Sequence, residues 1–306
     1  MCQLAAGGDH YAAVMPRATS NGLELEYDTF GAPSDPALVL VMGVGAQMIA
    51  WEPDFCGLLA DEGFHVVRFD NRDIGLSTYL EELGVPDLAS LVAGASQAPY
   101  QLADMADDVV GLLDALGIEK GHVVGASMGG MIAQQFAIDH PDRLLSLCSI
   151  MSTTGDPTVG HSQPEALAAL LRPAATSREQ AIEQGAATSR VFGSPGFPRS
   201  EEELRAKAAA SYDRAFHPAG AARQTAAIVA SPDRTEGLRG VDVPTLVVHG
   251  EADQLIDQSG GKATAAAVPD AELLIISGMA HDLPRGAWPP IVEAIARNAR
   301  RSFPAA

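Results

Sequence analysis

The sequence predicts an α/β fold in which helices cover both faces of a largely parallel sheet. Three observations support this class. Short apolar runs alternate with helical patterns along most of the chain, one run leads into a sharp glycine-rich turn and a helix, and the alternation fails only between about residues 152 and 240. Alternating strands and helices are typical of parallel sheets, in which sites form at the carboxyl ends of the strands.

The expected core strands are short and apolar, and the expected helices lie between and after them. The strands are Leu38–Met42, Val66–Phe69, Val123–Val124, Leu144–Ile150, Leu246–Val248 and Leu273–Ile276. The helices are Phe55–Glu62, Leu102–Leu116, Met131–His140, Gly260–Val268 and Pro290–Arg301. An earlier segment, Leu23–Asp28, alternates apolar with polar residues, which predicts an antiparallel strand at the margin of the sheet.

The break in the alternation predicts a helical cap inserted at residues 152–240. Its helical segments are Gln163–Leu171, Arg178–Gly185 and Ser200–Phe216. We therefore expect an N-terminal extension at residues 1–20 and a core formed by residues 21–151 and 241–306. Above the strand ends, the cap would cover an apolar pocket and exclude water. The alternative is a helical elaboration with no role in substrate choice.

The composition fits one large folded domain, or one domain with an insertion. Of the 306 residues, 47% are hydrophobic and 19% are charged, so the chain is long enough to bury a sizeable core. The 20 basic and 39 acidic residues give a formal net charge of −19. Nucleic acids and anionic membranes would repel such a chain, so neither is expected as a partner. Solubility explains the acidity.

Cysteine usage and the N-terminal sequence favour a cytoplasmic protein without a metal. Cys2, Cys56 and Cys148 are too few and too oddly placed for a disulfide framework, and Cys148 reads as a small core residue. No C-x-x-C motif or histidine cluster suggests metal ligands. The first twenty residues lack the basic start and apolar run of a secretory signal, and no apolar stretch approaches the ~20 residues that span a bilayer.

Residues 121–130 read GHVVGASMGG and place Ser127 at the apex of a strand, a sharp turn and a helix. Gly125 and Gly129 lack the Cβ atoms that would clash in so tight a turn, so the serine can be held in a strained conformation with its hydroxyl exposed. Ser127 is therefore the candidate nucleophile. A similar stretch around Ser96 runs into a proline with no helical pattern directly behind it, so Ser96 is expected in a loop.

A serine nucleophile requires a histidine base and a carboxylate that orients the base. His281 follows the last expected strand through a short loop and is the candidate base. Asp253 follows the preceding strand and is the candidate acid. His249 ends that preceding strand and is a rival base, although a structural role at the strand end suits it better. Asp257 is close enough in sequence to replace Asp253.

The chain order Ser127, Asp253, His281, with each residue in a loop after a different strand, resembles the α/β-hydrolase superfamily. The segments that carry the resemblance are Val41–Gly45, Asp70–Ser77, Gly125–Gly130, Val243–Asp253 and Gly278–His281. They span essentially residues 20–303 and imply an α/β-hydrolase fold, with a mostly parallel central sheet flanked by helices and a helical cap. A narrower resemblance, to bacterial esterases of the aclacinomycin methylesterase type, rests on the first two segments and on the pattern after Asp253.

The resemblance further implies an oxyanion hole made by the backbone N–H groups of Val44 and Met128. Many relatives have His-Gly where this chain has Met42 followed by glycine. A backbone donor does not depend on side-chain identity, but a side chain that often braces the loop is then missing. Arg72 and Asp73 are expected to hold their own loop through an internal polar network, and no chemistry is assigned to them.

The expected activity is hydrolysis of a small-molecule carboxylic ester through an acyl-enzyme, without a cofactor. The resemblance adds a polyketide-like methyl ester with a bulky apolar acyl part. Trp51, Phe192 and Phe216 are the candidate substrate contacts, although such apolar residues are often plain core. Further apolar candidates for the same pocket are Met48, Leu167, Leu171, Val191 and Ile228.

Other activities are compatible with the same three residues. Lactone hydrolysis, amide hydrolysis, carbon–carbon bond cleavage and cofactor-free peroxyacid formation all use this fold and triad, which do not determine the electrophile. A serine at position 127 argues against haloalkane dehalogenases and most epoxide hydrolases, which need a carboxylate nucleophile there. A different class of function is a ligand-binding module that kept the pocket without turnover.

Overall fold

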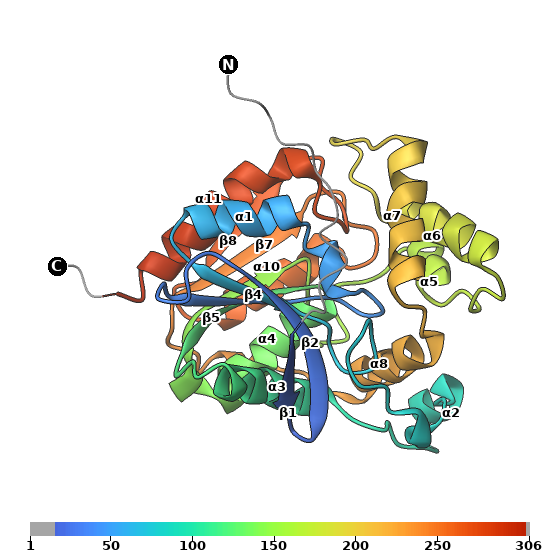
Figure 1. Cartoon of the computed structure of the whole chain (residues 1–306), viewed down its shortest axis with the longest axis horizontal. Coiled ribbons are helices and arrows are strands. Elements are labelled where there is room, and N and C mark those ends of the chain that lie inside the picture. The colour runs from blue at the N-terminus through green and yellow to red at the C-terminus, as the bar shows by residue number, and fades with distance from the viewer. Residues whose placement is uncertain (1–15, 304–306) are drawn as a thin grey trace.

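The computed structural model describes residues 16–303, which are built around one sheet (Figure 1). Its eight strands lie in the order β1-β2-β4-β3-β5-β6-β7-β8. The β1/β2 and β2/β4 pairs are antiparallel, and all other pairs are parallel. The strands are β1 (Arg17–Ser20), β2 (Leu23–Phe30), β3 (Ala37–Val41), β4 (His65–Phe69), β5 (Gly121–Ala126), β6 (Leu144–Ile150), β7 (Thr245–Gly250) and β8 (Glu272–Ile276). The mostly parallel α/β sheet predicted from the sequence is confirmed.

Helices cover both faces of this sheet (Figure 1). One face packs against α3 (Leu102–Ala115), α4 (Met128–Asp139) and α10 (Gln258–Ala267), and the other against α1 (Pro53–Asp61) and α11 (Trp288–Arg300). All five residues of β3 are buried, because alternate side chains enter the two cores. None of the helices in residues 16–303 combines the length and apolar character needed to cross a membrane.

The first two strands form a hairpin whose outer half differs from the prediction. The strand predicted at the sheet margin is antiparallel, but β1 pairs on its outer side and takes the marginal position. The connection is a two-residue turn in which Asn21 has a φ of 51° and Gly22 a φ of 77°. Two positive φ angles are what a type I′ hairpin turn requires, and Asn-Gly is its preferred sequence. This dipeptide was the signal that could have revealed β1.

The hairpin overlaps the predicted extension at residues 1–20, because Arg17–Ser20 is part of the sheet. Residues 1–15, and Cys2 with them, lie outside the described residues. Cys56 in α1 and Cys148 in β6 are buried free thiols. Burial raises the pKa of the Cys56 thiol to about 12, which makes it unreactive at neutral pH. Both cysteines are therefore packing residues of the hydrophobic core.

An inserted helical region separates β6 from β7, as predicted. Its helices, with no strand between them in this fully described stretch, are α5 (Pro164–Leu170), α6 (Arg178–Phe192), α7 (Glu201–Arg214), α8 (Pro218–Ala230) and α9 (Thr235–Leu238). Helices α5, α6 and α7 stand to one side of the sheet (Figure 1). The sequence did not predict α8, although a proline at its first position and an alanine-rich run are typical helix signals. We propose residues 152–240 as the extent of the cap.

Candidate active site

The turn between β5 and α4 holds Ser127 in a strained backbone conformation. Its φ of 56° and ψ of −121° lie in a region that costs a non-glycine residue about 1–3 kcal/mol. A Cβ on Gly125 would lie 1.9 Å from the carbonyl oxygen of Gly129, and a Cβ on Gly129 would lie 2.0 Å from that of Val41. Only glycine fits at either position. Helix α4 consequently begins directly after the serine, earlier than the sequence predicted.

His281 lies in the loop after β8 and faces the serine. Its Nε2 is 3.0 Å from Ser127 Oγ. The end of α6 and the residues that follow it hold this loop: the Phe192 carbonyl accepts the His281 N–H at 3.0 Å, and Ser194 Oγ accepts the Ala280 N–H at 2.8 Å. The Phe192 ring also meets the imidazole edge-on, with ring centroids 5.7 Å apart. The inserted region therefore helps to place His281.

Asp253 lies in the loop after β7 and reaches the other nitrogen of the same imidazole. Its Oδ2 is 2.7 Å from His281 Nδ1, and its Oδ1 accepts two backbone N–H groups of its own loop at 2.9 and 3.0 Å. Because a carboxylate only accepts, Nδ1 carries the proton of the ring. Nε2 is then free to accept the hydroxyl proton of Ser127. The three residues form one continuous hydrogen-bonded chain.

The two rival residues lie elsewhere. Asp257 is the N-cap of α10, and its carboxylate accepts a backbone N–H of that helix at 2.8 Å. His249 is fully buried, and its Nε2–H donates to the Ile256 carbonyl at 2.8 Å, with Asp253 Oδ2 at 3.5 Å. Burial lowers the pKa of His249, so its ring is neutral at neutral pH. Among the residues described, neither rival hydrogen-bonds to Ser127.

The loop after β3 passes directly beside the serine. A Cβ on Gly43 would lie 3.0 Å from Ser127 Cβ and 3.5 Å from its Oγ. Val44 comes next in this loop, and Met128 follows the serine as the first residue of α4. Within residues 16–303, neither of these two amides donates a hydrogen bond to another protein group. Unengaged N–H groups on either side of a serine are what an oxyanion hole needs.

Two buried ion pairs hold the loop after β4. Arg72 donates to both carboxylate oxygens of Asp108 on α3, at 2.6 and 2.7 Å. Asp73 accepts two hydrogen bonds from Arg223 on α8, at 2.6 and 2.8 Å, and one from the Tyr100 hydroxyl at 2.9 Å. Burial by itself would raise the pKa of Asp73, but the Arg223 bonds hold it below its usual value. The expected polar network is present, although its two members pair with α3 and α8.

The three predicted substrate contacts lie in different surroundings. Phe192 is half-buried beside His281. Phe216 is 44% exposed and packs against Tyr212 of α7, with ring centroids 4.9 Å apart. Trp51 is only 1% exposed and stacks on Phe55 in the core beneath α1 and α11, with ring centroids 5.5 Å apart. The structure therefore places Trp51 in the core, because its loop folds back onto α1, and only Phe192 beside the base.

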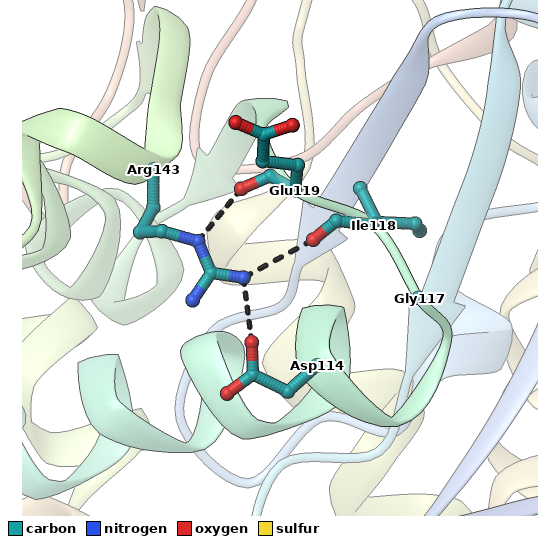
Figure 2. A pocket seen from close by; sticks show the side chains of 5 residues that line it. All are labelled: Asp114, Gly117, Ile118, Glu119 and Arg143. Carbon is teal, nitrogen blue, oxygen red and sulfur yellow. Dashed lines mark hydrogen bonds and ion pairs between the residues drawn. The ribbon is translucent and has the colours of Figure 1, made fainter.

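A pocket of about 330 Å³ lies at the amino ends of β5 and β6, away from Ser127 (Figure 2). Its lining residues are Asp114, Gly117, Ile118, Glu119 and Arg143. They precede β5 and β6, whereas Ser127 follows the end of β5. The Arg143 guanidinium donates to the carbonyls of Ile118 and Glu119 and to the Asp114 carboxylate, so it stabilises the end of α3 and the turn that follows.

In the part of the chain that the structure describes, no group of His, Cys, Asp and Glu side chains lies close enough together to hold a metal ion.

Comparison with protein families agrees with this fold. The model described as the alpha/beta hydrolase fold matches residues 36–284, which is most of the chain. The chain therefore belongs to the α/β-hydrolase family, and the resemblance seen in its sequence motifs is confirmed.

The names of individual relatives imply cleavage of different kinds of bond. Rhodomycin D methylesterase DauP from Streptomyces sp. is 25% identical over 92% of this chain and 97% of that protein. The 3-oxoadipate enol-lactonase 2 of Acinetobacter baylyi is 28% identical over 80% of this chain and 81% of that protein. A solved meta-cleavage product hydrolase from Pseudomonas fluorescens superposes with a TM-score of 0.75 at 18% identity, covering 94% of this chain and 98% of that one. The methylesterase match confirms the narrower resemblance.

Proposed function

We propose that the chain is a serine hydrolase that cleaves a small-molecule carboxylic ester through an acyl-enzyme. The observation that carries this proposal is the continuous chain from Ser127 Oγ to His281 at 3.0 Å and from His281 to Asp253 at 2.7 Å. Ser127 is the nucleophile, His281 the general base, and Asp253 the acid that orients it. The N–H groups of Val44 and Met128 form the oxyanion hole.

The proposed reaction has two halves. His281 Nε2 takes the Ser127 proton as Oγ bonds to the ester carbonyl carbon, and the Val44 and Met128 N–H groups stabilise the oxyanion. The imidazolium, stabilised by Asp253, returns the proton to the departing alcohol as the carbon–oxygen bond breaks. Water then attacks the acyl group, giving its proton to His281, and the acid leaves as that proton returns to Ser127. Each oxyanion donor typically contributes about 10²- to 10³-fold in rate.

The proposed substrate is a polyketide-like methyl ester with a bulky apolar acyl part. The near-full-length similarity to a rhodomycin D methylesterase supports this substrate class. The half-buried Phe192 ring beside His281 supplies an apolar surface where an acyl group would lie.

A lactone is the second candidate substrate, because an enol-lactonase is similar to this chain over most of its length. Carbon–carbon bond hydrolysis and peroxyacid formation would use the same three residues.

Hydrolysis of p-nitrophenyl acetate, butyrate and octanoate, with a chelator present, tests the proposal. The wild-type protein should release a burst of nitrophenolate equal to the number of active sites. Ser127→Ala should remain folded and lose activity by several orders of magnitude. Equal activity in the two proteins would remove Ser127 from the mechanism. Tight ligand binding without turnover in either would favour a binding module.

A second comparison separates ester from lactone hydrolysis. The kcat/KM values for a methyl ester and for a lactone of the same acyl size are measured in one buffer. The proposal expects the methyl ester to be preferred. A preference for the lactone would overturn the ester assignment while leaving the serine mechanism intact.

A further inference from the structure

Gln224 of α8 connects the inserted helical region to two loops at the carboxyl edge of the sheet. Its side chain is fully buried. Oε1 accepts the Gly45 N–H at 2.9 Å, and Nε2 donates to the Arg72 carbonyl at 2.8 Å. Because an N–H only donates and a carbonyl only accepts, these partners determine the orientation of the amide. Breaking either bond would leave a buried polar group without a partner, which is costly.

Gly45 belongs to the tight turn that carries Val44. The Ala46 N–H donates to the Gly43 carbonyl at 3.2 Å, and Gly45 has a φ of +68°. A positive φ at the third residue of such a turn is typical of type II and favours glycine. The peptide between Val44 and Gly45 is the one that flips when this turn changes type, and Gln224 holds the N–H of that peptide. The bond therefore fixes the turn type and anchors the turn to α8, and with it the position of Val44 in the loop beside Ser127.

The inserted region makes further contacts with the same loop, at Gly45 itself and at Gln47. A Cβ on Gly45 would lie 3.4 Å from Ala221 Cβ, so α8 packs closely on the turn. Further along the loop, Gln47 Nε2 donates to two carbonyls at the end of α7, at 2.7 and 2.9 Å. Arg214 of α7 donates to Gln47 Oε1 at 2.7 Å. The loop that lies beside Ser127 is therefore held in place by contacts with both α7 and α8.

We propose, building on the proposed function, that Gln224 is a positioning residue for the oxyanion hole. By holding the Gly45 N–H, it anchors the turn to α8 and keeps the Val44 N–H in place beside Ser127. Gln224 acts through the loop and does not touch the substrate. In many relatives a histidine side chain at the position of Met42 braces this loop. In this chain the loop is braced by Gln224 of the cap instead. Stabilisation of the oxyanion consequently depends on a docked α8.

Gln224→Met tests the proposal, because it keeps the length and volume of the side chain but removes both hydrogen bonds. With p-nitrophenyl butyrate, kcat per titrated serine should fall about 10- to 100-fold while KM changes less than about threefold, since a displaced donor loses part of its contribution. The Ki of phenylboronic acid, whose tetrahedral adduct with the serine places an oxygen in the hole, should rise by a similar factor. A purely structural role would lower the burst amplitude and leave kcat per active site and Ki unchanged.

Leu204→Ala is the matched control. Leu204 is an apolar side chain buried on α7, so its loss loosens the cap without removing a bond to the loop. We expect a lower melting temperature with kcat per active site within about threefold of wild type. An equal loss of kcat in Leu204→Ala and Gln224→Met would overturn the proposal. If Gln224→Met does not fold, Gln224→Asn makes the same test, because it is one methylene too short to span both loops.

Ser127→Ala in the same assay separates the two proposals. If Ser127→Ala loses the burst while Gln224→Met keeps wild-type kcat and Ki, the positioning role is wrong and the proposed function stands. If Ser127→Ala keeps full activity, the proposed function itself is wrong.

Discussion

Asp73 and Arg223, which are 150 positions apart in the chain, form a doubly hydrogen-bonded ion pair at 2.6 and 2.8 Å. Their side chains are 0% and 1% exposed. The pair joins the loop after β4 to α8, the helix that carries Gln224. Two charges removed from water are tolerated only while each neutralises the other, so this pair favours the position of α8 at which the two side chains meet.

Breaking this pair should be costly, and removing both charges should not. Arg223→Met leaves Asp73 buried and unpaired, and should lower the free energy of unfolding by about 3–5 kcal/mol in urea denaturation. Adding Asp73→Asn should recover most of that loss. The control is Arg178→Met, because the Arg178–Asp213 pair is about half exposed on each side, where water screens the charges, and should contribute little to stability. Similar losses in the Arg223 and Arg178 variants would contradict the argument.

Asp253→Asn should lower kcat by about 10²- to 10⁴-fold with little change in stability, because an amide at this place allows the wrong tautomer of His281. The acylation rate in the burst phase is the measurement. Asp257→Asn is the matched control: it alters the N-cap of α10 and a hydrogen bond from the His161 N–H, neither of which touches Ser127 or His281, so kcat should stay within about threefold of wild type. The opposite pattern would make Asp257 the acid.

The positions of the three candidate catalytic residues could be predicted because each depends on a local signal. Ser127 follows a β-branched run and lies between two glycines, and Asp253 and His281 each follow a short apolar strand. Parallel strands bring their carboxyl ends to one edge of the sheet, so residues far apart in sequence meet there. The three side chains therefore meet at that edge, where His281 lies within hydrogen-bond distance of both Ser127 and Asp253.

The parts that could not be predicted depend on contacts that leave no local pattern. Gln224 binds two backbone groups that are 179 and 152 positions away, and a single buried glutamine looks like any other in sequence. Trp51 is a predicted substrate contact because it lies in the loop after Gly45, but the short turn of helix before it directs the indole onto Phe55 of α1. In both cases the direction of a side chain depends on tertiary packing.

Gly129, two residues after Ser127, offers a direct test of the turn geometry. In Gly129→Ala, the new Cβ would meet the Val41 carbonyl at 2.0 Å, so the protein should lose more than about 3 kcal/mol of stability or fail to fold. The control is Gly121→Ala at the start of β5, where the nearest atom would be 3.5 Å away, an ordinary contact. Thermal unfolding of both variants is the measurement. A stable, active Gly129→Ala would show that the turn is looser than this geometry implies.

His122 should make the protein sensitive to mild acid. It is buried in β5, its Nδ1 is 2.8 Å from Ser146 Oγ, and within the described residues its Nε2 has no partner. Burial lowers the pKa of His122 to about 4, whereas an unfolded histidine titrates near ~6.5. Between these values the unfolded chain binds more protons, so the contribution of His122 is complete above pH ~6.5 and is lost as the pH falls towards about 4.

Urea denaturation at pH 7 and at pH 4.5 measures this effect. At about 1.4 kcal/mol per pH unit, the wild type should lose roughly 2–3 kcal/mol through His122 over that interval, in addition to losses from its carboxylates and from His249. His122→Gln is uncharged in both states and retains only the losses from the carboxylates and from the other buried histidines such as His249, so its free energy of unfolding should fall less. At pH 7 the variant should be the less stable protein, because the imidazole packs edge-on against Phe64 and bonds to Ser146. Parallel pH dependences in the two proteins would mean that His122 protonates in the folded state as readily as in the unfolded one, so that its burial carries no acid penalty.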